Sequence, residues 1–88
     1  MFEGLIDINN IPTIDLHGEY VDIARVYIND FINDNIKLKN EYIGIIHGKG
    51  TGKLKELTKE VLKNNKNVLE YKICYFNDGM TLVKLRKN

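Results

Sequence analysis

Apolar residues along this chain follow two repeats, one typical of β-strands and one typical of amphipathic helices. Short apolar or alternating runs predict four strands, at Thr13–Leu16, Tyr42–Ile46, Val68–Phe76 and Met80–Leu85. Apolar residues spaced three and four apart predict two helices, from Val21 to about Lys37 and from about Gly52 to Asn64. The element order is therefore βαβαββ, and its alternating first part requires a parallel pairing of strands.

Each predicted element has a core face and an outer face. Apolar spacing assigns to the core of the two helices Ala24, Ile28, Phe31, Ile32, Leu54, Leu57, Thr58, Val61 and Leu62. Along the third strand, one face carries Leu69, Tyr71, Ile73 and Tyr75, and the other carries Glu70, Lys72 and Cys74. Charges on one face favour a strand at a sheet edge. A hairpin turn is expected at Asn77-Asp78-Gly79.

A glycine-rich loop occupies the centre of the pattern. The second strand ends at His47-Gly48-Lys49-Gly50-Thr51-Gly52, and a helical repeat opens at Lys53. Glycine lets the backbone approach a ligand, and the amides of the loop and of a helix N-terminus can converge on an anion. The loop therefore predicts a phosphate cradle, whose binding residues would be Gly48, Lys49, Gly50, Thr51, Gly52 and Lys53. The alternative is a tight turn that needs glycine for its geometry alone.

Length and composition favour one small domain. We expect an N-terminal arm over residues 1–12, packed on the domain through Phe2, Leu5, Ile6 and Ile8, and a single domain over residues 13–88. No apolar run approaches the roughly 20 residues that span a membrane. The acidic N-terminus is unlike a signal peptide, and the single cysteine, Cys74, excludes an internal disulfide. These features predict a soluble cytoplasmic domain with no membrane partner.

Charge is distributed unevenly along the chain. Residues 1–34 carry seven acidic residues against one arginine, whereas the remainder carries twelve basic residues against five acidic ones, for a net charge of +1. Such asymmetry indicates a side that faces a polyanion. Lys55, Lys59 and Lys63 follow one another down one face of the second predicted helix. They are candidate peripheral contacts to nucleic acid, or simply a solvated helix face.

Three segments carry a resemblance to a known family. Ile14-Asp15-Leu16-His17-Gly18 and the His47–Gly52 loop resemble the two signatures of the small MutS-related (Smr) domain, and Gly79–Leu85 is similar to its closing strand. The resemblance covers about residues 13–85. It implies an α/β (α+β) two-layer sandwich like the C-terminal domain of bacterial translation initiation factor three. The mixed four-stranded sheet would have the order 1-2-4-3 with strand 4 antiparallel, and both helices would cover one face.

The resemblance also implies nucleic-acid binding, with endonuclease activity attributed to several family members. Both signatures would then lie at the carboxyl ends of adjacent parallel strands, where open α/β sheets place their sites. Asp15, His17 and His47 are the expected catalytic residues. Histidines with ordinary pKa values of about 6.5 suit general acid and base work. Asp15 would orient an imidazole or hold a divalent metal such as Mg²⁺ or Mn²⁺.

Two classes of function remain open at this point. The first is an endonuclease, a phosphodiester hydrolase that cleaves RNA or nicks structured DNA, in DNA repair or ribosome quality control. The second is a non-catalytic module that grips nucleic acid or a ribosome. The enzyme needs Asp15, His17 and His47, whereas the module needs mainly the loop and the lysines. We expect RNA, because Asp15 has no acidic neighbours in the sequence signature to hold a metal. A metal is expected only with DNA, and the sequence does not determine the oligomeric state.

Overall fold

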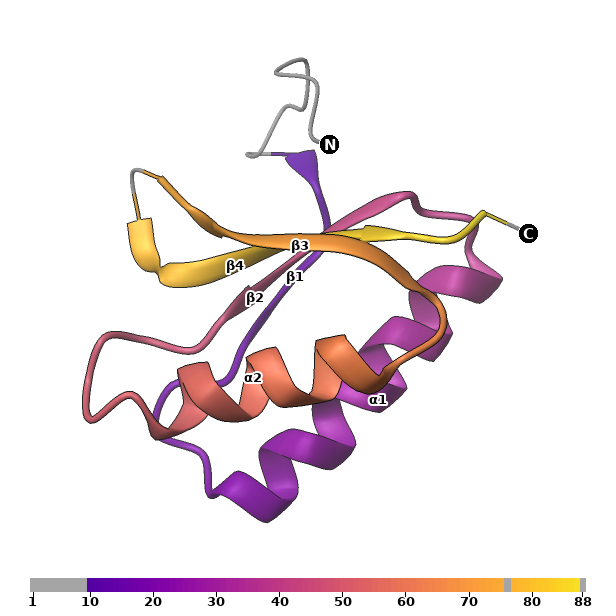
Figure 1. Ribbon diagram of the computed structural model, residues 1–88. Helices are drawn as coiled ribbons and strands as arrows, with labels where there is room; N and C mark the ends of the chain where they lie inside the picture. Colours follow the sequence, from indigo (N-terminus) through magenta and orange to yellow (C-terminus); the bar gives the residue numbers. More distant parts are fainter. Residues whose placement is uncertain (1–9, 76, 88) are drawn as a thin grey trace.

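A computed structural model describes residues 10–75 and 77–87, and the predicted order of elements is confirmed (Figure 1). The elements are β1 (Thr13–Asp15), α1 (Val21–Lys37), β2 (Tyr42–Ile46), α2 (Lys53–Asn64), β3 (Val68–Cys74) and β4 (Asn77–Leu85). The expected packing of Phe2, Leu5, Ile6 and Ile8 lies outside the described residues. Neither helix is long and apolar enough to cross a membrane within the described part of the chain.

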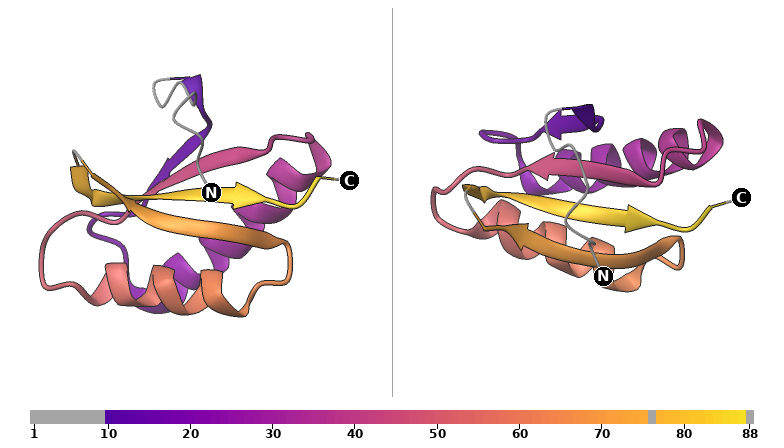
Figure 2. Two further views of the ribbon diagram at one scale, coloured as in Figure 1. Left: turned by 45° about the horizontal axis from the view of Figure 1, so that its top comes forward. Right: turned by 90° about the horizontal axis from the view of Figure 1, so that it is seen from above.

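The four strands form one mixed sheet of the order β1-β2-β4-β3, as the sequence resemblance implied. β1 and β2 are parallel, with Asp15 opposite Ile46, and β4 runs antiparallel to both β2 and β3. Both helices cover one face of this sheet, which the two further views confirm (Figure 2). The carboxyl ends of β1 and β2 therefore lie together, beside the residues that follow each strand.

The main core lies between the helices and the sheet. It is formed by the buried residues Leu16, Ala24, Ile28, Ile32, Ile43, Ile45, Leu57, Val61, Leu62, Val83 and Leu85. Of the residues predicted for the helix faces, Phe31 and Leu54 are only partly buried against this cluster. Burying one such aliphatic side chain contributes about 1.5–3 kcal/mol, so this cluster holds the loops after β1 and β2 in fixed relative positions.

The expected hairpin turn at Asn77–Gly79 is wrong. β4 already begins at Asn77, which pairs with Cys74, and β3 ends at Cys74 rather than at Phe76. A register irregularity between Ile73 and Cys74 moves the connection toward the N-terminus. The Gly79 N–H donates to Asn77 Oδ1 at 3.1 Å, so the asparagine stabilises a local bend at the start of the strand. The Asn-Asp-Gly segment therefore forms a bend within β4 and is not the turn that connects β3 to β4.

β3 is an edge strand, as its charges predicted, and its helix side is only partly covered. Tyr71 and Ile73 pair with Val83 and Thr81 of β4, and Tyr71 packs against the main core. α2 does not extend over the whole strand, and 50% of Leu69 and 37% of Ile73 remain exposed. The two helices thus leave a shallow groove along the edge strand β3.

Candidate functional site

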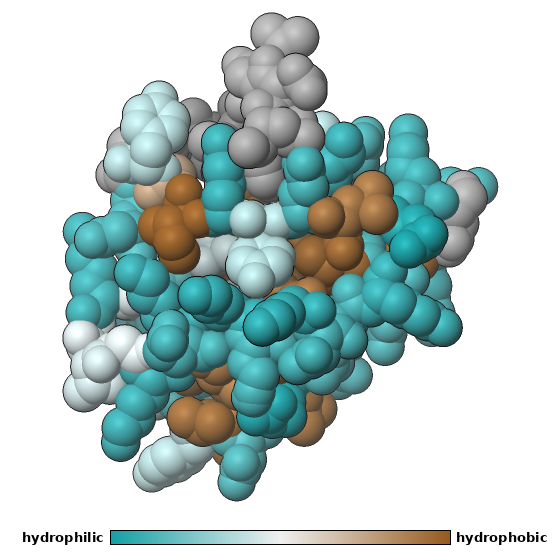
Figure 3. Space-filling model, in the orientation of Figure 1, coloured by the Kyte–Doolittle hydropathy of each residue, from teal (hydrophilic) through white to brown (hydrophobic). Residues whose placement is uncertain are grey.

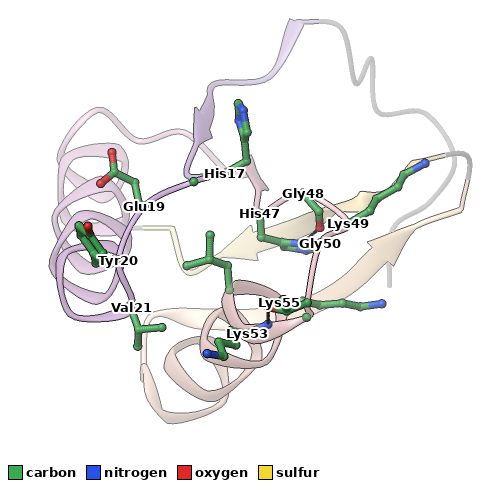
Figure 4. A pocket seen from close by; sticks show the side chains of 14 residues that line it. His17, Glu19, Tyr20, Val21, His47, Gly48, Lys49, Gly50, Lys53 and Lys55 are labelled. Atoms are coloured by element: carbon green, nitrogen blue, oxygen red, sulfur yellow. Dashed lines mark hydrogen bonds between the residues drawn. The ribbon is translucent and has the colours of Figure 1, made fainter.

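Both sequence signatures border one hollow at the carboxyl ends of β1 and β2. The hollow has a volume of about 540 Å³ and is lined by His17–Val21, which lead into α1, and by His47–Lys55, which lead into α2 (Figure 4). The predicted parallel pairing of the two strands is confirmed, and His17 and His47 both line this hollow, although only His17 is exposed and His47 is buried. We call this hollow the site pocket.

Asp15 and His17 form a hydrogen-bonded pair at the rim of the site pocket. His17 Nδ1 donates to Asp15 Oδ1 at 2.8 Å, and the His17 N–H donates to the same oxygen at 3.1 Å. The two side chains are 53% and 71% exposed, and His17 lies in the turn that follows the end of β1 at Asp15. Within the described residues, His17 Nε2 makes no hydrogen bond, so it can meet a substrate.

The pair shifts both of its own pKa values. The hydrogen bond from His17 lowers the pKa of Asp15, and the same bond raises the pKa of His17 above its usual 6.5. The carboxylate therefore favours the protonated imidazole and fixes its orientation. A proton on Nε2 of His17 would be available to a leaving group in this arrangement.

His47 has a different environment, and the geometry does not favour its expected part in acid–base chemistry. The residue is 3% exposed. Its Nδ1 donates to the carbonyl of Gly48 at 3.0 Å, so Nε2 of the neutral ring accepts from the Thr81 hydroxyl at 2.9 Å. Burial lowers the pKa of His47, with a further contribution from the charge of Lys55. A neutral ring with both nitrogens engaged instead ties the loop to β4.

Thr81 is a site residue that the sequence reasoning did not single out. It belongs to the Gly-Met-Thr start of the segment that resembles the closing strand of the family. A threonine on an otherwise apolar inner strand needs a polar partner when it is buried, and this was the available signal. Its partner is His47, which directly follows the neighbouring strand β2.

We predict that the two histidines titrate on opposite sides of pH 6.5. The chain contains only His17 and His47, so their ring signals can be followed by NMR across a pH series. The pKa of His17 should lie above 6.5 and that of His47 below it. In an Asp15→Asn variant, the higher pKa should return toward 6.5 while the lower one stays unchanged. Equal pKa values, or a variant without effect, would contradict the described geometry.

The glycine loop divides into a clamped part and an open part. The Gly79 carbonyl accepts the N–H groups of His47 at 2.8 Å and Gly48 at 3.0 Å. Gly48 was expected to donate to phosphate, but its amide is already used. No backbone carbonyl within the described residues takes up the amides of residues 49–52. The Lys53 N–H donates to Thr51 Oγ1 at 3.4 Å, so the amides of residues 49–52 and the other amides in the first turn of α2 remain as donors for an anion.

Two glycines of the loop are needed for its shape. Gly48 has a φ of +81°, and a Cβ there would lie 3.1 Å from the Cβ of His17. Gly52 has a φ of +89° and directly precedes α2 as its N-cap. Residues other than glycine rarely adopt these φ values. Gly48 therefore lets the loop approach His17, and Gly52 turns the chain into α2.

The lysines of the loop do not all point into the site pocket. Lys49 Nζ lies 3.2 Å from Asp78 Oδ1, and its side chain extends away from the hollow (Figure 4). Lys53 is exposed at the start of α2, as expected. Asp78 was not predicted for the site, and it partly offsets the positive charge of the loop. Among the described residues, no group of three or more His, Cys, Asp or Glu side chains could hold a metal ion.

The peripheral lysines lie along α2 beside β3. Lys55 is half-buried and borders the site pocket, while Lys59 and Lys63 are exposed farther along the helix. The sequence therefore placed these three residues on one helix face correctly. Their neighbours on β3 could not be identified from the helix alone.

Comparison with known proteins gives consistent matches. The family model of the Smr domain matches residues 14–86. The chain is 34% identical to endonuclease MutS2 of Symbiobacterium thermophilum over 86% of its own length and 10% of that protein. It is also 34% identical to endonuclease MutS2 of Halothermothrix orenii, over 77% of this chain and 9% of that protein. The chain thus spans about a tenth of the length of these relatives.

Two solved structures share the architecture. The crystal structure of the Smr domain of Thermus thermophilus MutS2 superposes with a TM-score of 0.84 at 28% identity, covering 86% of this chain and 99% of that one. YdaL, a stand-alone small MutS-related protein from Escherichia coli, gives a TM-score of 0.74 at 23% identity. It covers 85% of this chain and 64% of that one, and at this identity it supports the fold alone.

Proposed function

The chain belongs to the Smr domain family, and on this premise we propose that it binds nucleic acid at the site pocket and cleaves RNA there. The observation that carries the proposal is the exposed Asp15–His17 pair, with its 2.8 Å hydrogen bond, beside a glycine loop whose amides at residues 49–52 have no backbone acceptor in the described structure. The named endonucleases among its relatives support the same reaction class.

The loop would hold the phosphate that is to be cleaved. Open amides at residues 49–52 and the N-terminus of α2 present partial positive charge, to which Lys53 adds a full charge. Lys49 could join them if a phosphate displaced Asp78. Donors fixed in this way stabilise the charge that develops on the phosphate oxygens during in-line attack.

His17 would act as the general acid. The RNA 2′-hydroxyl oxygen attacks phosphorus and loses its proton to water, while the bond from phosphorus to the 5′-oxygen breaks. His17 Nε2–H gives that leaving oxygen a proton, and Asp15 holds the imidazole by its other nitrogen. The products are a 2′,3′-cyclic phosphate and a 5′-hydroxyl end. His47 takes no proton in this scheme and keeps the loop on β4 through Thr81.

DNA lacks the 2′-hydroxyl, so nicking DNA would require an activated water. A divalent Mg²⁺ or Mn²⁺ beside Asp15 would have to supply that activation, but the described residues bring no group of three His, Cys, Asp or Glu side chains together to hold one. The proposal is tested by incubating the protein with labelled RNA and DNA, with and without chelator, and identifying the product ends. RNA cleavage that survives chelator and leaves cyclic phosphate ends supports the RNA route. Chelator-sensitive cleavage of DNA alone would overturn it.

A second candidate is a module that binds nucleic acid or a ribosome without cutting. It is favoured by the burial of His47, which leaves His17 as the one exposed imidazole of a two-histidine chain. The same assay separates the candidates, because a module would bind the labelled strands and release them uncut. Either activity would suit the cytoplasm.

We predict that replacing Lys49 and Lys53 together with alanine weakens binding to RNA and DNA alike. Phosphate contacts release counterions, so the salt slope for single strands should fall by about 0.7 for each lysine that contacts a phosphate. Both side chains are exposed, and folding stability should change by less than about 0.5 kcal/mol. The measurement is fluorescence anisotropy at several salt concentrations.

The matched control removes two exposed lysines that line no part of the site pocket, Lys37 and Lys87. It changes the net charge equally but should leave the affinity near that of the wild type. An unaltered salt slope in the Lys49/Lys53 variant would move the nucleic-acid surface away from the loop.

A further inference from the structure

We propose that the groove between α2 and β3 holds a single strand of nucleic acid that continues from the site pocket. This inference rests on the proposed function, because the strand would be the same one whose phosphate the loop holds. It adds a path, a preference for single strands and an aromatic contact at Tyr71.

The groove is continuous with the site pocket. Its first hollow, of about 220 Å³, is bordered by Lys55 and Lys59 of α2, Tyr71 of β3 and Thr81 of β4. A second hollow, of about 400 Å³, shares Tyr71 with the first and extends to Lys63. Lys55 also borders the site pocket. The three hollows therefore adjoin in a row, and the groove starts at the threonine that bonds His47.

The charge of the groove suits a polyanion. Lys55, Lys59 and Lys63 follow at intervals of four residues, about 6 Å along the helix axis, which is close to the spacing of phosphates in an extended strand. Within the described residues these three lysines form no ion pair, whereas Arg25 pairs with Glu60 at 3.3 Å. The two hollows are also lined by Lys72 and by the carboxylates Glu56 and Glu70, so four basic residues stand against two acidic ones and the groove keeps an excess of positive charge.

The floor of the groove suits unpaired bases. Tyr71 borders both hollows, and the half-exposed Leu69 and Ile73 lie on either side of it along β3. Figure 3 shows pale and brown surface on this face, bordered by teal surface. Bases stack on aromatic side chains whatever their sequence, but only when they are not already stacked in a duplex. The groove therefore selects single strands.

The test compares variants of the whole chain by fluorescence anisotropy with a short labelled single-stranded RNA and the matching duplex. Wild type should bind the single strand more tightly. Lys59→Ala with Lys63→Ala should lower that affinity about tenfold and reduce the salt slope. Tyr71→Leu should also lower it about tenfold, because the ring is lost, whereas Tyr71→Phe should not.

The Lys37→Ala and Lys87→Ala control pair should bind like the wild type. Wild-type affinity in both the lysine pair variant and Tyr71→Leu would overturn the groove while leaving the proposed function intact. Equal affinity for duplex and single strand would overturn the selection of single strands. A wild-type protein that binds no nucleic acid would overturn both proposals. If Tyr71→Leu fails to fold, the exposed lysine pair decides the question alone.

Discussion

Replacing His17 with alanine should lower the rate of RNA cleavage by about 10²–10⁴-fold and leave RNA affinity within a few-fold. The side chain is 71% exposed and makes its hydrogen bond only to Asp15, so its loss removes a proton donor without disturbing the core. Single-turnover cleavage rates and anisotropy on the same RNA measure the two effects separately. A loss of affinity as large as the loss of rate would indicate that His17 binds substrate instead.

Asp15→Asn is the companion variant, and its effect should depend on pH. Asp15 raises the pKa of His17, so the wild type keeps its proton donor to a higher pH than an isolated histidine would. In the variant that pKa falls back, and the alkaline limb of the rate profile should move to lower pH. Undiminished cleavage by both variants would remove the Asp15–His17 pair from the mechanism, whereas a wild type that cleaves no substrate would leave a binding module.

Replacing Thr81 with valine should lower the free energy of unfolding by about 1–3 kcal/mol at pH 7. Valine has nearly the same shape, but it leaves Nε2 of the buried His47 without its partner at 2.9 Å. Cleavage should fall as well, because that contact holds the glycine loop against β4. Thr81→Ser keeps the hydroxyl and is the matched control. Denaturant titration of both variants gives the comparison, and equal stabilities would show that the contact contributes little.

The two histidines should affect stability in different pH windows. The folded pKa of His47 is lowered, so its contribution is complete above 6.5 and is lost as pH falls below 6.5, where only the unfolded chain takes up the proton. The folded pKa of His17 is raised, so its contribution is complete below 6.5 and is lost as pH rises through the folded value. The Thr81 comparison is therefore cleanest near neutral pH.

Much of the fold follows from local sequence patterns. The bounds of Tyr42–Ile46 were predicted to the residue, and the helix predicted from Val21 to about Lys37 is confirmed, because strong apolar periodicity and the surrounding turn residues agree. The sheet order came from the family resemblance, which periodicity alone does not supply. The Asn77–Gly79 turn was misplaced, since a local turn preference can also be met by a bend at a strand start, as the Asn77–Gly79 hydrogen bond shows.

The site was predicted as a location more completely than as a mechanism. Asp15 and His17 are two residues apart, which predicted that they share a face, but β1 ends at Asp15 and His17 lies in the following turn, where Asp15 Oδ1 accepts from both the backbone N–H and the ring of His17. The burial of His47 depends on Thr81 and Gly79, which are more than thirty residues away in sequence and reach it only through β2–β4 pairing. The Gly79 carbonyl also accepts the N–H of Gly48, so that amide is not available to a ligand. Such effects belong to tertiary packing and have no signature within the loop itself.

The Asp15–His17 pair depends on the end of one strand, whereas the loop and the groove depend on β2, β4, α2 and β3. Under the proposed function, cleavage and nucleic-acid binding can therefore diverge separately during evolution. One nucleotide change in the His17 codon suffices to encode asparagine or tyrosine, and this exposed position would accept either with little cost to folding. Under the proposed function, a nuclease of this architecture is one substitution away from a module that binds the same strand without cutting it.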